Sequence, residues 1–223
     1  MITIGESISR VRGILKGTTE DSFLTDRFVY SIISKYTKLT LRKQQLQNQL
    51  MKHEDLFKML SFVDLIDVDK IEADCAGIKS NCTIKRTEKK LPKIFNGNRG
   101  PLIRKIYSID GSLEFVQISP AAYIAITMST NFKYNKSKYY WFRNGYLYFP
   151  DVDIEAVMVE ALWEDSLDGF CSTEDDECMP MQEQTIPMPD YLFAEVEQMA
   201  QQEFTITLKI PDDGSDDGQN LLR

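Results

Sequence analysis

Two pairs of cysteine residues share one spacing and could hold a metal ion. Six residues separate Cys75 from Cys82, and six separate Cys171 from Cys178. Four thiolates form many structural zinc sites, but those sites usually place about two to four residues between paired cysteines. The spacing leaves three alternatives open: one zinc site, two disulfides, or reduced thiols in a protein assembled in the cytosol. We favour the reduced thiols.

Motifs of the common enzyme classes are absent from the sequence. There is no glycine-rich phosphate loop, no HExxH zinc motif and no GxSxG nucleophile motif. His53 is the only histidine, and the residues around it match no catalytic motif. Two DVD triplets, at 67–69 and 151–153, could bind Mg²⁺ for nuclease chemistry, although such pairs at strand ends are mostly solvated turns. We therefore expect no enzymatic activity and no cofactor.

Basic and acidic residues are concentrated in different parts of the chain. The net charge is −8, but residues 1–150 contain 24 Lys+Arg and 14 Asp+Glu, whereas residues 151–223 contain 2 and 20. Identical copies or neighbouring proteins could meet through such surfaces of opposite charge. The alternative is that the acidic third contains only solvated loops.

Residues 79–105 form the most basic segment, with nine basic residues and one acidic residue, Glu88. We predict that this segment is an extended arm that contacts partners through Lys85, Arg86, Lys89, Lys90, Lys93 and Arg99. DNA phosphates are one candidate partner. The pI near 4.8 and the lack of aromatic residues between 79 and 93 argue against a dedicated DNA binder, so we favour an acidic neighbouring protein.

The N-terminal part of the chain is predicted to be helical. Residues 3–16 have apolar side chains on one face, which predicts a short helix. Residues 25–50 predict a long amphipathic helix with Thr25 as its N-cap, because apolar residues recur every three to four positions at Phe28, Ile32, Tyr36, Leu39, Leu46 and Leu50. Its long polar continuation, RKQQLQNQ, indicates packing against another copy or a partner.

Residues 61–163 are predicted to form a β region. We expect a strand at about 61–68, a hairpin at Asp110–Gly111 and a second hairpin at Asn144–Gly145. Ser119–Pro120 predicts the start of a short helix between the hairpins. Residues 153–165 are ambiguous by period, and we favour a strand that pairs with the second hairpin.

The resulting fold class is α+β, with an N-terminal helical pair that includes a long central helix, a C-terminal helix, and an inserted antiparallel β region with two hairpins and extended arms. The expected divisions are a helical pair at 1–60, the β region at 61–163 with its basic arm at 79–105, an acidic loop at 164–188, the C-terminal helix at 189–204 and an extended tail at 205–223. Residues 205–210 are β-like and could pair with a sheet edge of a neighbour. The predicted contact residues there are Phe204, Ile206, Leu208 and Ile210.

Several segments, in their order along the chain, resemble the neck ring proteins of crAss-like bacteriophages. The most specific are Leu91-Pro92-Lys93-Ile94 with Gly97-Asn98, and Asn144-Gly145-Tyr146-Leu147-Tyr148. More broadly, a helical pair with a β excursion is similar to the head–tail connector (adaptor) proteins of short-tailed phages. The resemblance covers nearly the whole chain, and its motifs are structural and not catalytic.

This resemblance implies a structural virion protein located in the neck, at the head–tail junction, and assembled in the bacterial host cytoplasm. It implies a homo-oligomer, a dodecameric ring that docks below the portal protein, extends the DNA channel for genome ejection and joins the capsid to the tail. The implied partners are the portal, other neck ring and tail proteins, and packaged DNA passing through the channel, with no membrane involved. The alternative is a phage DNA-binding accessory protein that acts through residues 79–105.

Overall fold

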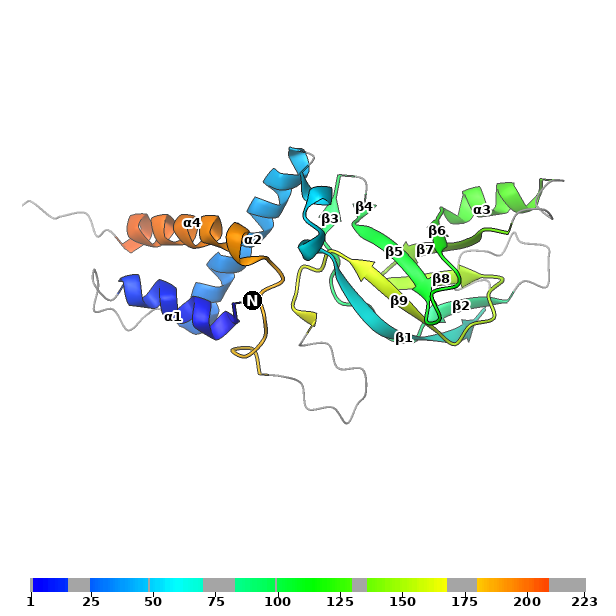
Figure 1. Ribbon diagram of the computed structural model, residues 1–223, viewed down its shortest axis with the longest axis horizontal. Coiled ribbons are helices and arrows are strands. Elements are labelled where there is room, and N and C mark those ends of the chain that lie inside the picture. The colour runs from blue at the N-terminus through cyan, green and yellow to red at the C-terminus, as the bar shows by residue number, and fades with distance from the viewer. Residues whose placement is uncertain are drawn as a thin grey trace, which may run out of the picture. The chain divides into compact units, whose positions relative to one another are not determined.

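The computed structural model describes residues 2–15, 25–47, 49–69, 83–98, 100–129, 136–167 and 180–208 (Figure 1). The chain divides into two compact units. Met1–Leu50 and Met179–Arg223 form a helical unit, and Met51–Cys178 form a sheet unit. The chain therefore leaves the helical unit once, builds the sheet unit, and returns for its last helix.

Three helices make up the described part of the helical unit: α1 (Ile4–Leu15), α2 (Asp26–Leu46) and α4 (Asp190–Leu208). The helices predicted at 3–16 and from Thr25 are confirmed, and the side chain of Thr25 accepts a hydrogen bond from the backbone N–H of Phe28 at 3.3 Å. The C-terminal helix α4 packs on α1 and α2. The core between them is apolar and consists of Ile4, Ile8, Val11, Val29, Ile33, Leu41, Phe193, Val196, Ala200 and Phe204.

The returning chain is fixed against the start of α1. Thr3 forms an antiparallel bridge with Thr185, and the N–H of Ile4 donates to the carbonyl of Gln184 at 2.9 Å. Gly5 allows this close approach, because a Cβ at that position would lie 2.9 Å from the carbonyl oxygen of Gln182.

The sheet unit contains a seven-stranded sheet with the order β5-β9-β1-β2-β8-β7-β6. Two 3₁₀ turns, η1 (Leu50–Lys52) and η2 (Glu54–Leu56), precede it, and a small two-stranded sheet pairs β3 (Asn96–Gly97) with β4 (Gly100–Pro101). The seven strands are β1 (Lys58–Val68), β2 (Ile84–Thr87), β5 (Ile103–Ser108), β6 (Phe115–Gln117), β7 (Lys138–Arg143), β8 (Tyr146–Pro150) and β9 (Ala156–Ala161). All neighbouring strands are antiparallel except β6 and β7, which α3 (Pro120–Thr127) connects.

This sheet curls until its two edges meet, since Tyr107 in β5 forms a bridge with Glu114 just before β6. Alternate side chains therefore face two different cores. The inner face buries the larger cluster, which includes Val63, Ile106, Leu147, Phe149, Val157, Val159 and Trp163. The outer face of β2, β7 and β8 carries a second cluster, in which Ile84 and the aromatic residues Tyr139, Trp141 and Tyr148 pack under Tyr123 of α3.

The predicted fold class is wrong. A large mixed sheet, not an inserted antiparallel β region with two hairpins and extended arms, forms the body of the second unit. The prediction missed β2 because its sequence, IKRT, resembles a solvated basic segment, although Ile84 and Thr87 are buried. It missed the parallel pair because the Asp110–Gly111 turn assigned residues 115–117 to a hairpin with β5, whereas β6 pairs with β7.

The two hairpin predictions have different outcomes. The Asn144–Gly145 hairpin is confirmed between β7 and β8, and both turn residues have positive φ, 54° and 88°, as a type I′ turn requires. Asp110–Gly111 does form a turn, but β5 and β6 share only the single bridge, since β5 pairs with β9 and β6 with β7. The ambiguous segment is a strand, as predicted, but β9 pairs with β1 and β5 and not with the second hairpin.

The predicted extended arms are also wrong wherever the structure describes them. Residues 83–98 and 100–105 of the basic segment fold into β2, the small β3–β4 sheet and the start of β5. At the other end, α4 continues as a helix to Leu208, so residues 205–208 are not a β-strand. A strand there would have to break the helix directly after Phe204, which is fully buried in the helical core.

Candidate interaction surfaces

The residues with metal-binding chemistry do not converge in the described part of the chain. Cys75, Cys82, Cys171 and Cys178 lie outside the described residues, so the zinc alternative stays a prediction. Among the described residues, no three His, Cys, Asp or Glu side chains are grouped closely enough to hold a metal ion. No described helix is both long enough and apolar enough to cross a membrane.

Each DVD pair lies beside lysine side chains. Asp151 Oδ2 is 3.9 Å from Lys138 Nζ, and Asp153 Oδ1 is 4.0 Å from Lys85 Nζ. Asp67 is paired across the ladder with Lys85. These cations already offset the carboxylate charge that a Mg²⁺ ion would need, which argues against a nuclease centre.

The cations of the basic segment form ion pairs within the sheet unit. Lys93 Nζ lies 2.9 Å from Glu164 Oε2, and this hydrogen bond raises the pKa of Lys93. Lys85, whose side chain is only 15% exposed, donates to the carbonyl of Ile154 at 3.0 Å. The acidic partners belong to residues 151–164, so part of the basic segment is neutralised by the same unit's own acidic residues.

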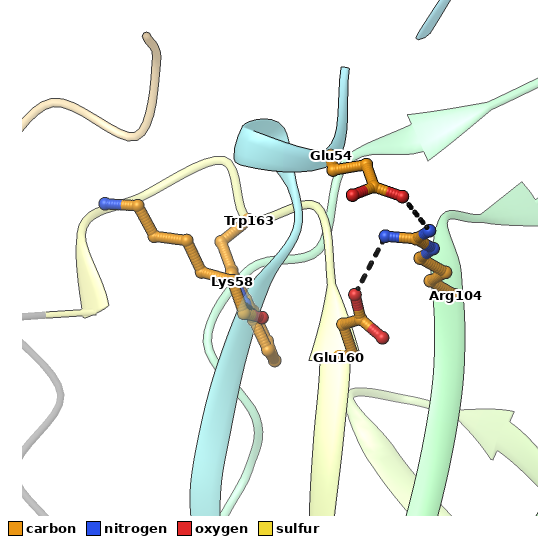
Figure 2. Close-up of polar contacts among 5 residues, drawn as sticks. All are labelled: Glu54, Lys58, Arg104, Glu160 and Trp163. Carbon is orange, nitrogen blue, oxygen red and sulfur yellow. Dashed lines mark hydrogen bonds and ion pairs between the residues drawn. The ribbon is translucent and has the colours of Figure 1, made fainter. Parts of the chain in front are cut away.

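Arg104 makes the most extensive of these contacts, as Figure 2 shows. Its guanidinium lies between two carboxylates, 3.2 Å from Glu54 and 3.1 Å from Glu160, and its Cζ is 5.4 Å from the centre of the Phe57 ring. The hydrogen bond to Glu54, followed by the charge of Glu160, raises the pKa of Arg104. This cluster ties η2 to β5 and β9, which is a structural role.

Trp163 lies at the same end of the sheet, beside the Arg104 cluster. Its side chain is fully buried, and its Nε1–H donates to the carbonyl of Lys58 at 2.8 Å (Figure 2). The backbone of Trp163 also forms a β-bridge with Ile94, so this residue connects β1, through its indole, to the segment before β3. A buried indole with its N–H satisfied stabilises this junction.

The remaining predicted cations have different surroundings. Arg86 lies over the ring of Tyr146 at 4.6 Å, Lys89 is half-buried, Lys90 is exposed, and Arg99 lies outside the described residues. Their assignment to a contact with an acidic neighbouring protein stays a prediction.

The predicted contact residues of the C-terminal tail are placed only in part. Phe204 is buried in the helical core, where its ring meets Phe28 edge-on at 6.1 Å, so it is not on the surface of this unit. Ile206 and Leu208 lie in the last turns of α4, and Ile210 lies outside the described residues.

A row of exposed apolar residues lies on α2, along the apolar stripe predicted from the sequence. Phe28, Leu39 and Leu46 are 45%, 49% and 72% exposed. Their spacings of eleven and seven residues place them almost in line on the helix, with Lys35 and Arg42 beside them. We call these three residues the α2 row.

The opposite side of α2 buries polar residues in the same stretch of helix. Thr37, Thr40 and Gln44 are each less than a tenth exposed. Thr37 Oγ1 donates to the carbonyl of Ile33 at 2.9 Å, but Thr40 Oγ1 and Gln44 Oε1 have no hydrogen-bond partner among the described residues. The C-terminal half of α2 therefore turns Leu39 and Leu46 outward and unpaired polar atoms inward, the reverse of what a solitary helical unit favours.

Comparison with known protein families identifies the family to which the chain belongs. The model of a family described as phage tail ring protein 2 matches residues 6–220, nearly the whole sequence. No curated protein matches the chain.

Proposed function

Because this chain belongs to the phage tail ring protein 2 family, and is thus a structural ring protein of the virion, we propose that it is a head–tail connector of the neck. In this role, twelve copies close a ring that docks below the portal protein, extends the DNA channel and joins the capsid to the tail. The ring assembles in the host cytoplasm and gives packaged DNA a path during ejection.

The α2 row is the observation that carries this proposal. Three large apolar side chains in line on one helix, above a buried polar layer, cost stability in a monomer but become favourable when a partner covers them. Lys35 beside the row is already paired with Glu203 at 2.8 Å, so Arg42 is the flanking cation that favours a partner with an acidic rim. We assign this surface to the neighbouring neck protein, the portal or the next ring.

The ion pairs of the sheet unit weigh against the DNA-binding alternative. A protein that binds DNA through residues 79–105 would need several unpaired cations to release counterions from phosphates. Lys93 and Arg104 instead contact Glu164, Glu54 and Glu160. We therefore expect weak DNA binding at physiological salt.

Co-purification with the cognate portal protein tests the proposal. The wild-type chain should join the portal in a complex that electron microscopy shows as stacked rings. Leu39→Asp or Leu46→Asp should abolish docking, because each places a charge in the apolar contact. Ser31→Asp is the matched control, since it adds the same charge to an exposed position of α2 outside the row and should leave docking intact. Docking that survives both leucine substitutions would refute the assignment of the α2 row.

A further inference from the structure

The outer face of the curled sheet is covered on only one side among the described residues. Tyr123 of α3 packs on Tyr139 at 5.9 Å and on Trp141 at 6.0 Å between ring centres, so α3 covers the side formed by β7, β8 and β2. Over β1, Met59 and Phe62 are instead 45% and 60% exposed. Among the described residues, the outer side formed by β9 and β1 is thus uncovered around Met59 and Phe62, with Glu160 as the ladder partner of Met59.

A β-bulge in β1 directs Phe62 outward. Leu60 pairs with Val159, and Val63 pairs with Val157. The chain therefore advances three residues in β1 where it advances two in β9, which leaves one extra residue in β1. The extra residue places both Ser61 and Phe62 on the outer face, while Leu60 and Val63 keep their contacts with the inner core. Regular alternation would have turned one of these two residues inward, and the bulge instead puts a phenylalanine into solvent.

The helix α3 is itself incompletely covered. The stretch from Ser119 to Ser129 contains no charged residue, and Tyr123 is the only residue of α3 that is fully buried. Its outward face consists of alanines at 121, 122 and 125, followed by Met128, which is 68% exposed. A helix that is apolar on all sides is normally buried, so this outward face also lacks a partner within the part of the chain that the structure describes.

The two uncovered surfaces lie on different sides of the sheet unit. In the strand order, β9 and β1 are separated from β7 by β2 and β8, and the sheet curls between them. Figure 1 shows α3 above the sheet of this unit and β1 along its lower side. One copy therefore presents an apolar helix on one side and an apolar sheet face on the other, as a head-to-tail contact between identical copies requires.

We propose that α3 of one copy packs on the β9–β1 face of the next copy, through Ala125 and Met128 on the helix and Met59 and Phe62 on the sheet. This inference rests on the proposed ring function and names the contact that closes the ring. It repeats between copies the packing that α3 makes within one copy, a helix laid on aromatic side chains of a sheet.

Two single-residue variants, each disabling a different surface, test the contact. Phe62→Asp disables the sheet face and Ala125→Arg disables the helix face. Both positions are exposed, so both variants should fold, which circular dichroism and thermal melting would verify. Ile109→Asp is the control, because Ile109 is 44% exposed but lies in the turn after β5. Sedimentation velocity measures the assembly state of each protein and of their mixtures.

We expect the wild type and Ile109→Asp to form species larger than a dimer. Each interface variant alone should sediment as a monomer of 25.7 kDa, with association weakened roughly a hundredfold. An equimolar mixture of the two should form a dimer and nothing larger. The Phe62→Asp copy still offers an intact helix face, and the Ala125→Arg copy still offers an intact sheet face.

The other outcomes separate this inference from the proposed function. If both variants assemble like the wild type, ring formation stands and the α3–β1 contact is wrong. If the mixture stays monomeric, or if Ile109→Asp is also monomeric, the contact is likewise overturned. If the wild type is monomeric at every concentration, both alone and with its portal, the ring function itself fails.

Discussion

The unpaired hydroxyl of Thr40 gives a stability prediction with an internal control. Thr40 is fully buried and its Oγ1 has no partner among the described residues, whereas Thr37, one turn earlier, donates to Ile33. Burying a hydroxyl without a hydrogen bond costs roughly 1–3 kcal/mol. Valine has nearly the same shape and helix propensity as threonine, so Thr40→Val removes this cost without leaving a cavity.

We expect Thr40→Val to raise the free energy of unfolding by about 1 kcal/mol relative to Thr37→Val, which exchanges a satisfied hydroxyl for a methyl group. For a unit of this size, that difference corresponds to about 4–8 °C in melting temperature. Urea denaturation followed by helical circular dichroism would measure both variants. If Thr40→Val is no more stable than Thr37→Val, the claim that α2 buries an unpaired polar layer is wrong.

Three further predictions concern the sheet unit. Trp163→Phe should lower its free energy of unfolding by about 1–3 kcal/mol, because the hydrogen bond to the carbonyl of Lys58 and part of the buried ring are lost; a melting temperature equal to wild type would contradict this. Gly145→Ala should cost about 1–2 kcal/mol, because Gly145 has a φ of 88°, and an unchanged urea midpoint would count against it. Hydrogen bonds from Ser108 and Ser112 lower the pKa of Asp110 from 3.8 to about 2. This carboxylate therefore stabilises the fold above about pH 4 and loses its contribution as the pH falls toward 2, so Asp110→Asn should flatten the acid limb of a stability–pH curve.

Local sequence signals predicted the elements that depend on local chemistry. Asn144–Gly145 predicted a hairpin because both residues tolerate positive φ, and Ser119–Pro120 predicted α3 because its cap and first turn are set by neighbouring residues. Thr25 predicted the start of α2 for the same reason. These predictions needed no knowledge of distant parts of the chain.

The elements that the sequence could not predict depend on distant partners. Asp110–Gly111 has the composition of a hairpin turn, but β5 finds β9, some 50 residues away, as its ladder partner. By composition alone, the basic segment at residues 79–105 resembles a solvated stretch. In the structure, acidic residues between 153 and 164 form ion pairs with Lys85, Lys93 and Arg104. Local composition does not reveal either pairing, because both require the curled sheet to bring the strands together.

The surfaces were the hardest part to predict. On α2, the hydrophobic period predicted an apolar stripe. It did not predict which side of the helix is buried in the C-terminal half, the side with Leu39 and Leu46 or the side with Thr40 and Gln44. The structure turns the leucines outward. Phe62 could not be predicted to be exposed either, because the bulge that turns it outward appears only in the pairing with β9. Both surfaces deviate from the usual burial pattern, which is the reason to treat them as contacts.

A reconstruction of the virion neck by electron cryomicroscopy tests the central claim most directly. Our account predicts a closed ring of this chain around the DNA channel next to the portal. In that ring, α3 of each copy should lie on β1 of the next, and the α2 row should be covered by a neighbouring neck protein. A neck without this chain, or copies in it that do not touch one another, would contradict the account.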